Sequence, residues 1–368
     1  MSFWKSIQRT LAALALATTA TLAVAQATPG APGEARQSLD DAWFTGPMLA
    51  PNATTLPRGH FLIEPYLYDV IAQGFYDRDG KRHNTPRSDG FGSLTYILYG
   101  LANKFTVGMI PVAGYTEMSN GPSSAGIGMG DLTLQGQYRL KLFHEGSRIP
   151  TMSVAVQETL PTGKYDRLGN RPSDGFGGGA YTTTVAFYSQ TYFWMPNGRV
   201  LRMRFNVVPA FSSSVNVRDV SVYGTSTGFR GHATPGASVL VDAAWEYSLT
   251  RRWVLALDAV YRHQGNTAVS GYNVLDPNRS PLQLNSEASD AFQFGSRHRI
   301  QLEAQHRSAP GNSPDSGRAQ HPCHPHSGNR DQLRPLICSK IKSNHEGYEG
   351  ITKAVSASPL CNLSDLRG

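Results

Sequence analysis

The chain has 368 residues, which is enough for one large barrel or two ordinary domains. Only 17% of the residues are charged, whereas 40% are hydrophobic and 37 are glycine. The formal net charge of +7 comes from the two ends of the chain, because the part between them has nearly equal numbers of basic and acidic residues. The charge therefore does not indicate a nucleic-acid partner.

Residues 1–27 have the pattern of a secretory signal peptide. Lys5 and Arg9 precede an apolar run from Leu11 to Val24, and small residues suited to cleavage follow at 23–27. A membrane anchor is the alternative, but the apolar run is short and diluted by threonine. We therefore expect an exported protein.

Residues 28–58 are rich in proline and alanine and have no strand or helix periodicity. They predict an irregular leader ahead of the first strand. We expect this leader to lie in the periplasm, and a partial plug beneath or inside the following fold is the alternative.

Strand-like runs recur between residues 59 and 295. The clearest is Gly130 to Leu142, where the apolar Leu132, Leu134, Tyr138 and Leu140 alternate with polar and charged residues. A period of two places the two sets on opposite faces of a strand. The ten predicted strands are His60–Tyr68, Ser93–Leu101, Phe105–Tyr115, Asp131–Leu142, Thr151–Leu160, Tyr181–Trp194, Val200–Phe211, Ser238–Tyr247, Trp253–His263 and Ala288–Phe294.

The connections between these runs alternate between long and short. Long loops, polar or rich in glycine, are expected at Gln73–Gly92, Thr116–Gly130, Pro161–Gly179, Ser212–Gly236 and Gln264–Glu287, and shorter turns between them. This alternation is typical of an up-and-down antiparallel transmembrane β-barrel, with long loops outside the cell and short turns in the periplasm. The predicted barrel at 59–295 implies the lipid bilayer and the outer-membrane insertion machinery as partners.

The alternation stops at about Ser296, and residues 296–368 contain all three cysteines and most of the histidines. His321, Cys323, His324 and His326 resemble metal ligands, but a second explanation accounts for more of the sequence. Back-translation from Arg299 in the next reading frame can encode two further barrel strands followed by a stop. We expect 296–368 to be a disordered, frameshifted tail that replaces the last two of about 12 designed strands, and the coding DNA tests this.

Strand parity also predicts which side chains line the lumen. Charges on the lipid face cost a few kcal/mol each near the middle of the membrane, so the charged rows must face inward. They either fill a narrow barrel or select solutes, and the sequence leaves both open. The predicted lumen-lining residues are Asp131, Gln135, Gln137, Arg139, Lys141, Arg202, Arg204, Asn206, Asp258 and Arg262.

Four segments resemble the MetA-pathway phenol-degradation family of outer-membrane proteins. They read FTGPMLAP, RGHFLIEPY, GMGDLTLQGQYRL and QETLPTGKYD, and the most specific parts are Gly128–Leu140 and Gln157–Asp166. The resemblance covers about His60 to Phe294. It implies an outer-membrane barrel that moves small hydrophobic or aromatic solutes, and it supplies no catalytic residues.

We therefore expect a channel or transporter in the cell outer membrane, without enzyme activity, cofactor or metal. Two alternatives remain open at the level of the sequence. One is a barrel enzyme that acts on lipid or peptide, and the other is a structural or adhesive barrel that works through its long outer loops.

Overall fold

The computed structural model describes residues 36–39, 42, 44, 46, 49–77, 79–249 and 253–300, with the side chains of 297–300 left out. The predicted signal peptide at 1–27 and the predicted tail after residue 300 lie outside the described residues. No helix in the described part of the chain is long and apolar enough to cross a membrane.

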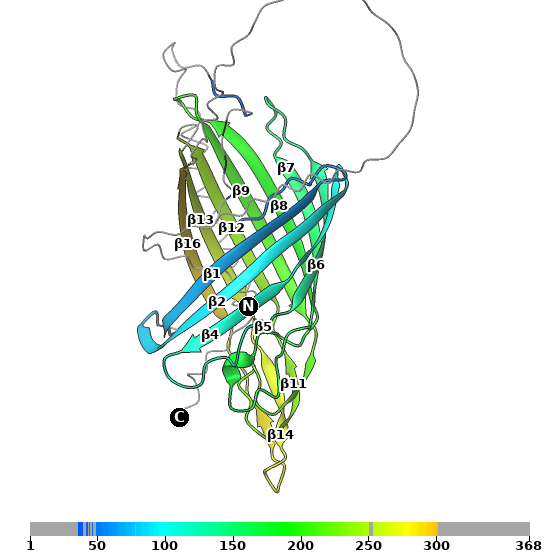
Figure 1. The fold of residues 1–368 in the computed structure, drawn as a ribbon, viewed down its shortest axis with the longest axis vertical. Coiled ribbons are helices and arrows are strands. Elements are labelled where there is room, and N and C mark those ends of the chain that lie inside the picture. The colour runs from blue at the N-terminus through cyan, green and yellow to red at the C-terminus, as the bar shows by residue number, and fades with distance from the viewer. Residues whose placement is uncertain are drawn as a thin grey trace, which may run out of the picture. The chain divides into compact units, whose positions relative to one another are not determined.

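One antiparallel sheet, called the wall below, contains twelve strand segments, which form ten long strands that lie side by side (Figure 1). β3 and β4 continue one another across Pro111, which has no N–H to donate, and β5 and β6 continue one another across 130–131. The segments are β1 Phe61–Tyr76, β2 Arg82–Ala102, β3 Phe105–Ile110, β4 Val112–Met118, β5 Gly128–Met129, β6 Leu132–Lys141, β7 Thr151–Leu160, β8 Thr182–Trp194, β9 Val200–Ser212, β12 Ser238–Ser248, β13 Trp253–Gln264 and β16 Ser289–Ile300.

Each long strand of the wall pairs with the long strand before and after it in the sequence, which is up-and-down topology. All ten predicted runs coincide with these long strands, so the predicted fold class is confirmed. β16 continues to Ile300 in register with Trp253 of β13, past the predicted end of the barrel at 295.

The described residues contain no ladder between the two end strands, since β1 pairs with β2 and β16 pairs with β13. A sheet that crosses a bilayer must close, because lipid cannot satisfy the N–H and C=O groups of an open edge. Two more strands between β16 and β1 would bring the ten long strands to twelve, which keeps the even count of such barrels. The frameshift that would have removed them stays a prediction.

Burial in the wall is the reverse of burial in a water-soluble sheet. On β13 the large side chains of Trp253, Leu255 and Leu257 are 42%, 39% and 45% exposed, whereas Asp258 is 2% exposed. On β6, Leu134 and Tyr138 are likewise exposed. We call the face with the exposed apolar side chains the outer face, and the opposite face the inner face. Lipid is the environment that suits such an outer face.

A second, four-stranded sheet follows the ordinary rule and buries its apolar side chains. Its strands are β10 Val215–Arg218, β11 Phe229–Thr234, β14 Ala268–Asn273 and β15 Pro281–Gln283, in that order. Its core contains Val217, Tyr223, Phe229, Ala233 and Val269. We call it the small sheet.

The small sheet corrects the prediction that Ser212–Gly236 and Gln264–Glu287 are plain loops. Their strands are short and pair only with one another. The predicted loop Gln73–Gly92 was also wrong. β1 and β2 extend through it to a turn at 77–81, where Asp77 Oδ1 accepts hydrogen bonds from the N–H groups of Asp79 and Lys81.

Acid is expected to weaken the small sheet through Asp219. Hydrogen bonds from Arg230 Nη1 at 2.9 Å and from Gly228 N–H at 3.0 Å hold the pKa of Asp219 below its usual value. A depressed pKa contributes stability above the unfolded-state pKa, and that contribution is lost as the pH falls below about 4. Because the ion pair is partly exposed, we expect a loss of less than about 1 kcal/mol.

Hydrogen exchange of the β10 and β11 amides, measured from neutral pH down to acid, tests this expectation. Asp219→Asn should remove most of the pH dependence. An unchanged pH profile in the variant would contradict the role of Asp219.

Candidate functional site

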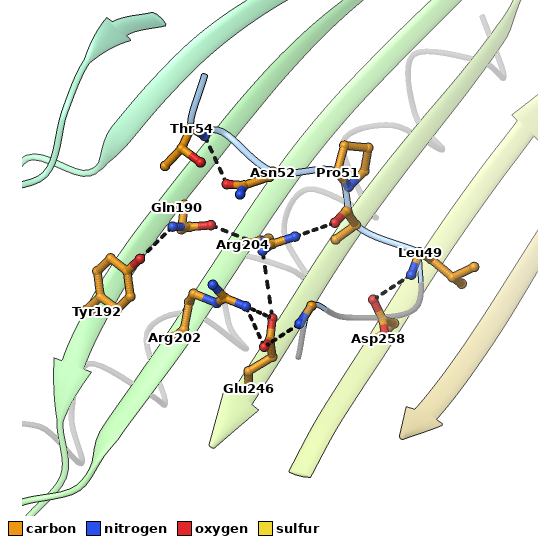
Figure 2. A network of polar contacts seen from close by, with 12 residues as sticks. Leu49, Pro51, Asn52, Thr54, Gln190, Tyr192, Arg202, Arg204, Glu246 and Asp258 are labelled. Atoms are coloured by element: carbon orange, nitrogen blue, oxygen red, sulfur yellow. Dashed lines mark hydrogen bonds and ion pairs between the residues drawn. The ribbon is translucent and has the colours of Figure 1, made fainter. Parts of the chain in front are cut away.

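A buried network of charged and polar side chains lies on the inner face of β8, β9 and β12 (Figure 2). Arg202 Nη2 donates to both carboxylate oxygens of Glu246 at 2.6 Å, and Arg204 Nη2 lies 4.0 Å from Glu246 Oε1. Arg204 Nε also donates to Gln190 Oε1 at 2.9 Å, and Gln190 Nε2 donates to the Tyr192 hydroxyl at 2.8 Å. Two guanidinium groups thus share one carboxylate, out of contact with solvent.

The leader binds this network through its backbone (Figure 2). The N–H of Gly46 donates to Glu246 Oε2 at 3.2 Å, and the N–H of Leu49 donates to Asp258 Oδ1 at 3.3 Å. The carbonyl of Ala50 accepts from Arg204 Nη1 at 2.7 Å. The carbonyl of Pro51 accepts from Asn206 Nδ2 at 3.2 Å.

The next leader residues continue along the inner face toward β6, β7 and β3. Gln137 Nε2 donates to the carbonyl of Asn52 at 2.9 Å and to Ser153 Oγ at 2.9 Å. The side chain of Ala53 is fully buried in a cluster with Ala155, Ala186 and Tyr188.

The leader then reaches β3 and the turn after β2. The N–H of Leu56 donates to Thr106 Oγ1 at 2.8 Å, and Thr55 Oγ1 donates to the carbonyl of Asn103 at 2.9 Å. We call residues 49–56 the strap. The strap is bound across the inner face from β13 to β3. This is the arrangement expected if the leader is a partial plug, which was the alternative to a leader in the periplasm.

Upstream of the strap, the described leader residues contact the turn between β8 and β9. Trp194 Nε1 donates to the carbonyl of Gln37 at 2.8 Å, and the N–H of Gln37 donates to the carbonyl of Gly198 at 3.0 Å. The Arg202 guanidinium lies 4.2 Å from the centre of the Phe44 ring. Both ends of the described leader therefore lie at the end of the wall with the short turns, near Gly198 and Asn103.

Five of the ten predicted lumen-lining residues come together at the strap. Gln137, Arg202, Arg204, Asn206 and Asp258 are buried, and all except Arg202 bond the strap backbone directly. These five side chains share the face on which the strap is bound, and that this face lines a lumen stays a prediction.

Three further predicted residues lie on the inner side without contacting the strap. Gln135 is half-buried and accepts a hydrogen bond from Gln157 Nε2 at 3.1 Å. Arg139 and Arg262 are half-buried, Arg139 opposite Ser153 and Arg262 opposite Leu240.

Two of the predicted lumen-lining residues have other surroundings. Lys141 is exposed, because a register shift after Arg139 pairs it with Met152 and takes it out of the inner row. Asp131 holds the loop 161–179, as its two carboxylate oxygens accept hydrogen bonds from the N–H groups of Gly163 at 2.9 Å and Gly178 at 2.7 Å.

Sequence reasoning missed Glu246, Gln190 and Asp242, all of which are 1% exposed on the inner face. The parity rule could have found Glu246 and Asp242, because they alternate with Val241, Ala243 and Trp245. Nothing in the side-chain pattern could have indicated the strap, since its bonds to the network come from its backbone.

The loop 161–179 packs against the inner face near β4 and β5. The Phe176 ring lies against Gly114 and Gly128, which are directly opposite each other, and a side chain at Gly128 would overlap the ring. The N–H of Phe176 donates to the carbonyl of Lys164 at 2.9 Å, which fixes the loop on itself. The loop and the strap thus cover different parts of the inner face.

Gly128→Val is expected to displace Phe176 and to destabilise the packed loop by roughly 1–3 kcal/mol, because the ring cannot share its space with a valine. Limited proteolysis of the loop 161–179 measures the displacement. Gly126→Val is the matched control, as nothing lies within 4 Å of the position of its Cβ. Equal cleavage of the two variants would show that Phe176 does not depend on Gly128.

No group of three or more His, Cys, Asp or Glu side chains in the described ranges could hold a metal ion. The cysteine and histidine cluster at 321–326 lies outside the described residues. His232 Nε2 lies 3.0 Å from Ser270 Oγ on the small sheet, a pairing that the sequence did not suggest. Within the described residues no carboxylate bonds His232, so nothing orients this exposed imidazole as a base.

The chain was compared with protein families, curated proteins and solved structures. The family model described as "Putative MetA-pathway of phenol degradation" matches residues 82–316, which is more than half of the chain. No curated protein matches. Among solved structures, the COG4313 outer membrane channel from Pseudomonas putida F1 is similar, with 14% sequence identity and a TM-score of 0.45, over 68% of this chain and 98% of that one. The chain belongs to the family described as "Putative MetA-pathway of phenol degradation".

Proposed function

We propose that this protein is an outer-membrane channel through which small hydrophobic or aromatic solutes pass. The observation that carries the proposal is the reversed burial of the wall. Its outer face exposes Leu134, Leu255 and Leu257, whereas its inner face buries Arg202 and Asp258. Membership of a family associated with phenol degradation supports aromatic compounds as the solutes.

Passage would occur along the inner face, where charged groups and hydrogen-bonding side chains alternate with small apolar ones. Ala155, Ala186 and Ala256 are fully buried there beside Gln137 and Asp258. The small apolar side chains of such an interior can pack against the faces of an aromatic ring. Its polar side chains can hydrogen-bond a polar substituent at the edge of the ring. The partners that we propose are the solute, the lipid bilayer and the outer-membrane insertion machinery, which would insert the protein into the membrane.

Swelling of proteoliposomes in phenol, benzoate or a neutral sugar of similar size tests the channel. The full chain should be compared with a chain in which the second reading frame restores the last two strands. We expect faster swelling in the aromatic solutes than in the sugar, and faster swelling with the restored chain. No permeation above protein-free liposomes with either chain would overturn the proposal.

A further inference from the structure

We propose that the strap is a resident gate, which closes the inner face at rest and must leave it before a solute can pass. This inference rests on the proposed channel function. The strap occupies the same side chains that a solute would meet, namely Gln137, Arg204, Asn206 and Asp258.

The strap is attached by side chains of the wall and is not part of the sheet. Residues 49–58 form no strand and pair with none, and their bonds to the wall side chains and turns run from single backbone groups and from the Thr55 hydroxyl. Displacing the strap therefore breaks a set of separate hydrogen bonds and leaves every ladder of the wall intact. A segment held in this way can move while the wall keeps its shape.

The network beneath the strap is also incompletely satisfied while the strap is bound. Arg202 Nε, Asn206 Oδ1 and both carboxylate oxygens of Asp242 are buried without a hydrogen bond to any described protein atom. Buried polar atoms in native proteins are nearly always paired, so groups of this kind need an explanation. In a second, open state these atoms would find hydrogen-bond partners in solvent or solute, which would explain why they are unpaired while the strap is bound.

The two ends of the strap differ in how they are held. After Leu56 the chain runs directly into β1, where the N–H of Gly59 donates to the carbonyl of Gly100 at 2.8 Å. At the other end, Glu246 accepts from the N–H of Gly46 at 3.2 Å and Asp258 accepts from the N–H of Leu49 at 3.3 Å. We infer that the strap pivots near Leu56, where the chain joins β1, when it leaves the inner face.

A disulfide between the strap and the wall tests the gate in the full chain. The variant pairs Ala53→Cys with Ala155→Cys, which belong to one buried cluster, after Cys323, Cys338 and Cys361 are changed to serine. Ala53→Cys with Ala186→Cys is a second geometry in case the first pair does not bond. The matched control joins wall to wall through Ala155→Cys and Ala186→Cys, which are directly opposite each other on β7 and β8.

Ion conductance in planar bilayers is measured for each variant, oxidised and then reduced. We expect the strap-to-wall disulfide to lower conductance several-fold and reduction to restore it, with no change in the wall-to-wall control. Deletion of residues 36–56 should raise conductance above that of the intact chain.

The possible failures can be told apart. If the intact chain conducts but neither the strap-to-wall disulfide nor the deletion changes its conductance, the proposed gate is wrong and the proposed channel stands. If neither the intact chain nor the deletion conducts, the proposed channel function itself fails. If the deletion variant conducts but reduction of the strap-to-wall disulfide does not change the conductance, the strap is a fixed plug and the proposed gate is again wrong.

Discussion

Replacing Glu246 by alanine is expected to destabilise the protein by about 3–5 kcal/mol, the loss that follows when a buried ion pair is broken by removing one partner. Glu246 is 1% exposed and is the only carboxylate that the described residues place within 4.0 Å of Arg202 and Arg204. Its removal leaves two buried guanidinium groups with no carboxylate of the described residues within 4.0 Å. It also removes the acceptor of the Gly46 N–H.

Unfolding in urea, followed by tryptophan fluorescence of the detergent-solubilised chain, measures this loss. Glu246→Gln should cost less than alanine, because the amide keeps an oxygen acceptor for Arg202. Glu145→Ala is the matched control, since the Arg36–Glu145 pair has side chains 56% and 54% exposed and is expected to contribute less than about 1 kcal/mol. If Glu246→Ala is as stable as Glu145→Ala, the buried network does not stabilise the wall.

The second large effect is expected on the outer face. Leu257→Arg should cost about 2–4 kcal/mol, because it places a charge in lipid near the middle of β13. Trp253→Arg, on the same face at the start of the strand, should cost about 0–1 kcal/mol, since an arginine near the interface can reach water.

Folding into lipid vesicles across a urea series measures both variants, and the intact chain provides the reference. The depth dependence is the critical result. Equal costs at 253 and 257 would mean that β13 does not cross the membrane at the proposed depth.

The strands of the wall were predictable because a membrane strand has a simple repeating constraint. β6 and β13 alternate residue by residue, since one face meets lipid and the other does not. The same constraint placed Arg202, Arg204 and Asn206 on the inner face without any knowledge of their partners. Alternation along the strand does not place Lys141, because an extra residue after Arg139 shifts the register.

The strap and the small sheet could not be predicted in this way. The strap is recognised through the carbonyls of Ala50 and Pro51 and the N–H of Leu49. Every residue has such a carbonyl and every residue except proline has such an N–H, so these bonds leave no mark on the side-chain pattern. β10 and β11 are short strands held by a local core around Val217 and Phe229, and their sheet is completed by β14 and β15 from a separate loop. Both features depend on contacts between distant parts of the chain.

The most direct test of the account is a spin-label scan of β6 in lipid vesicles. Nitroxides at Leu134 and Tyr138 should be accessible to oxygen dissolved in the lipid and shielded from a water-soluble nickel reagent. A nitroxide at Gln135 should be shielded from lipid-dissolved oxygen, because this side chain faces the inner side of the wall. The reverse pattern, or water accessibility at Leu134 and Tyr138, would contradict a wall whose apolar face meets lipid.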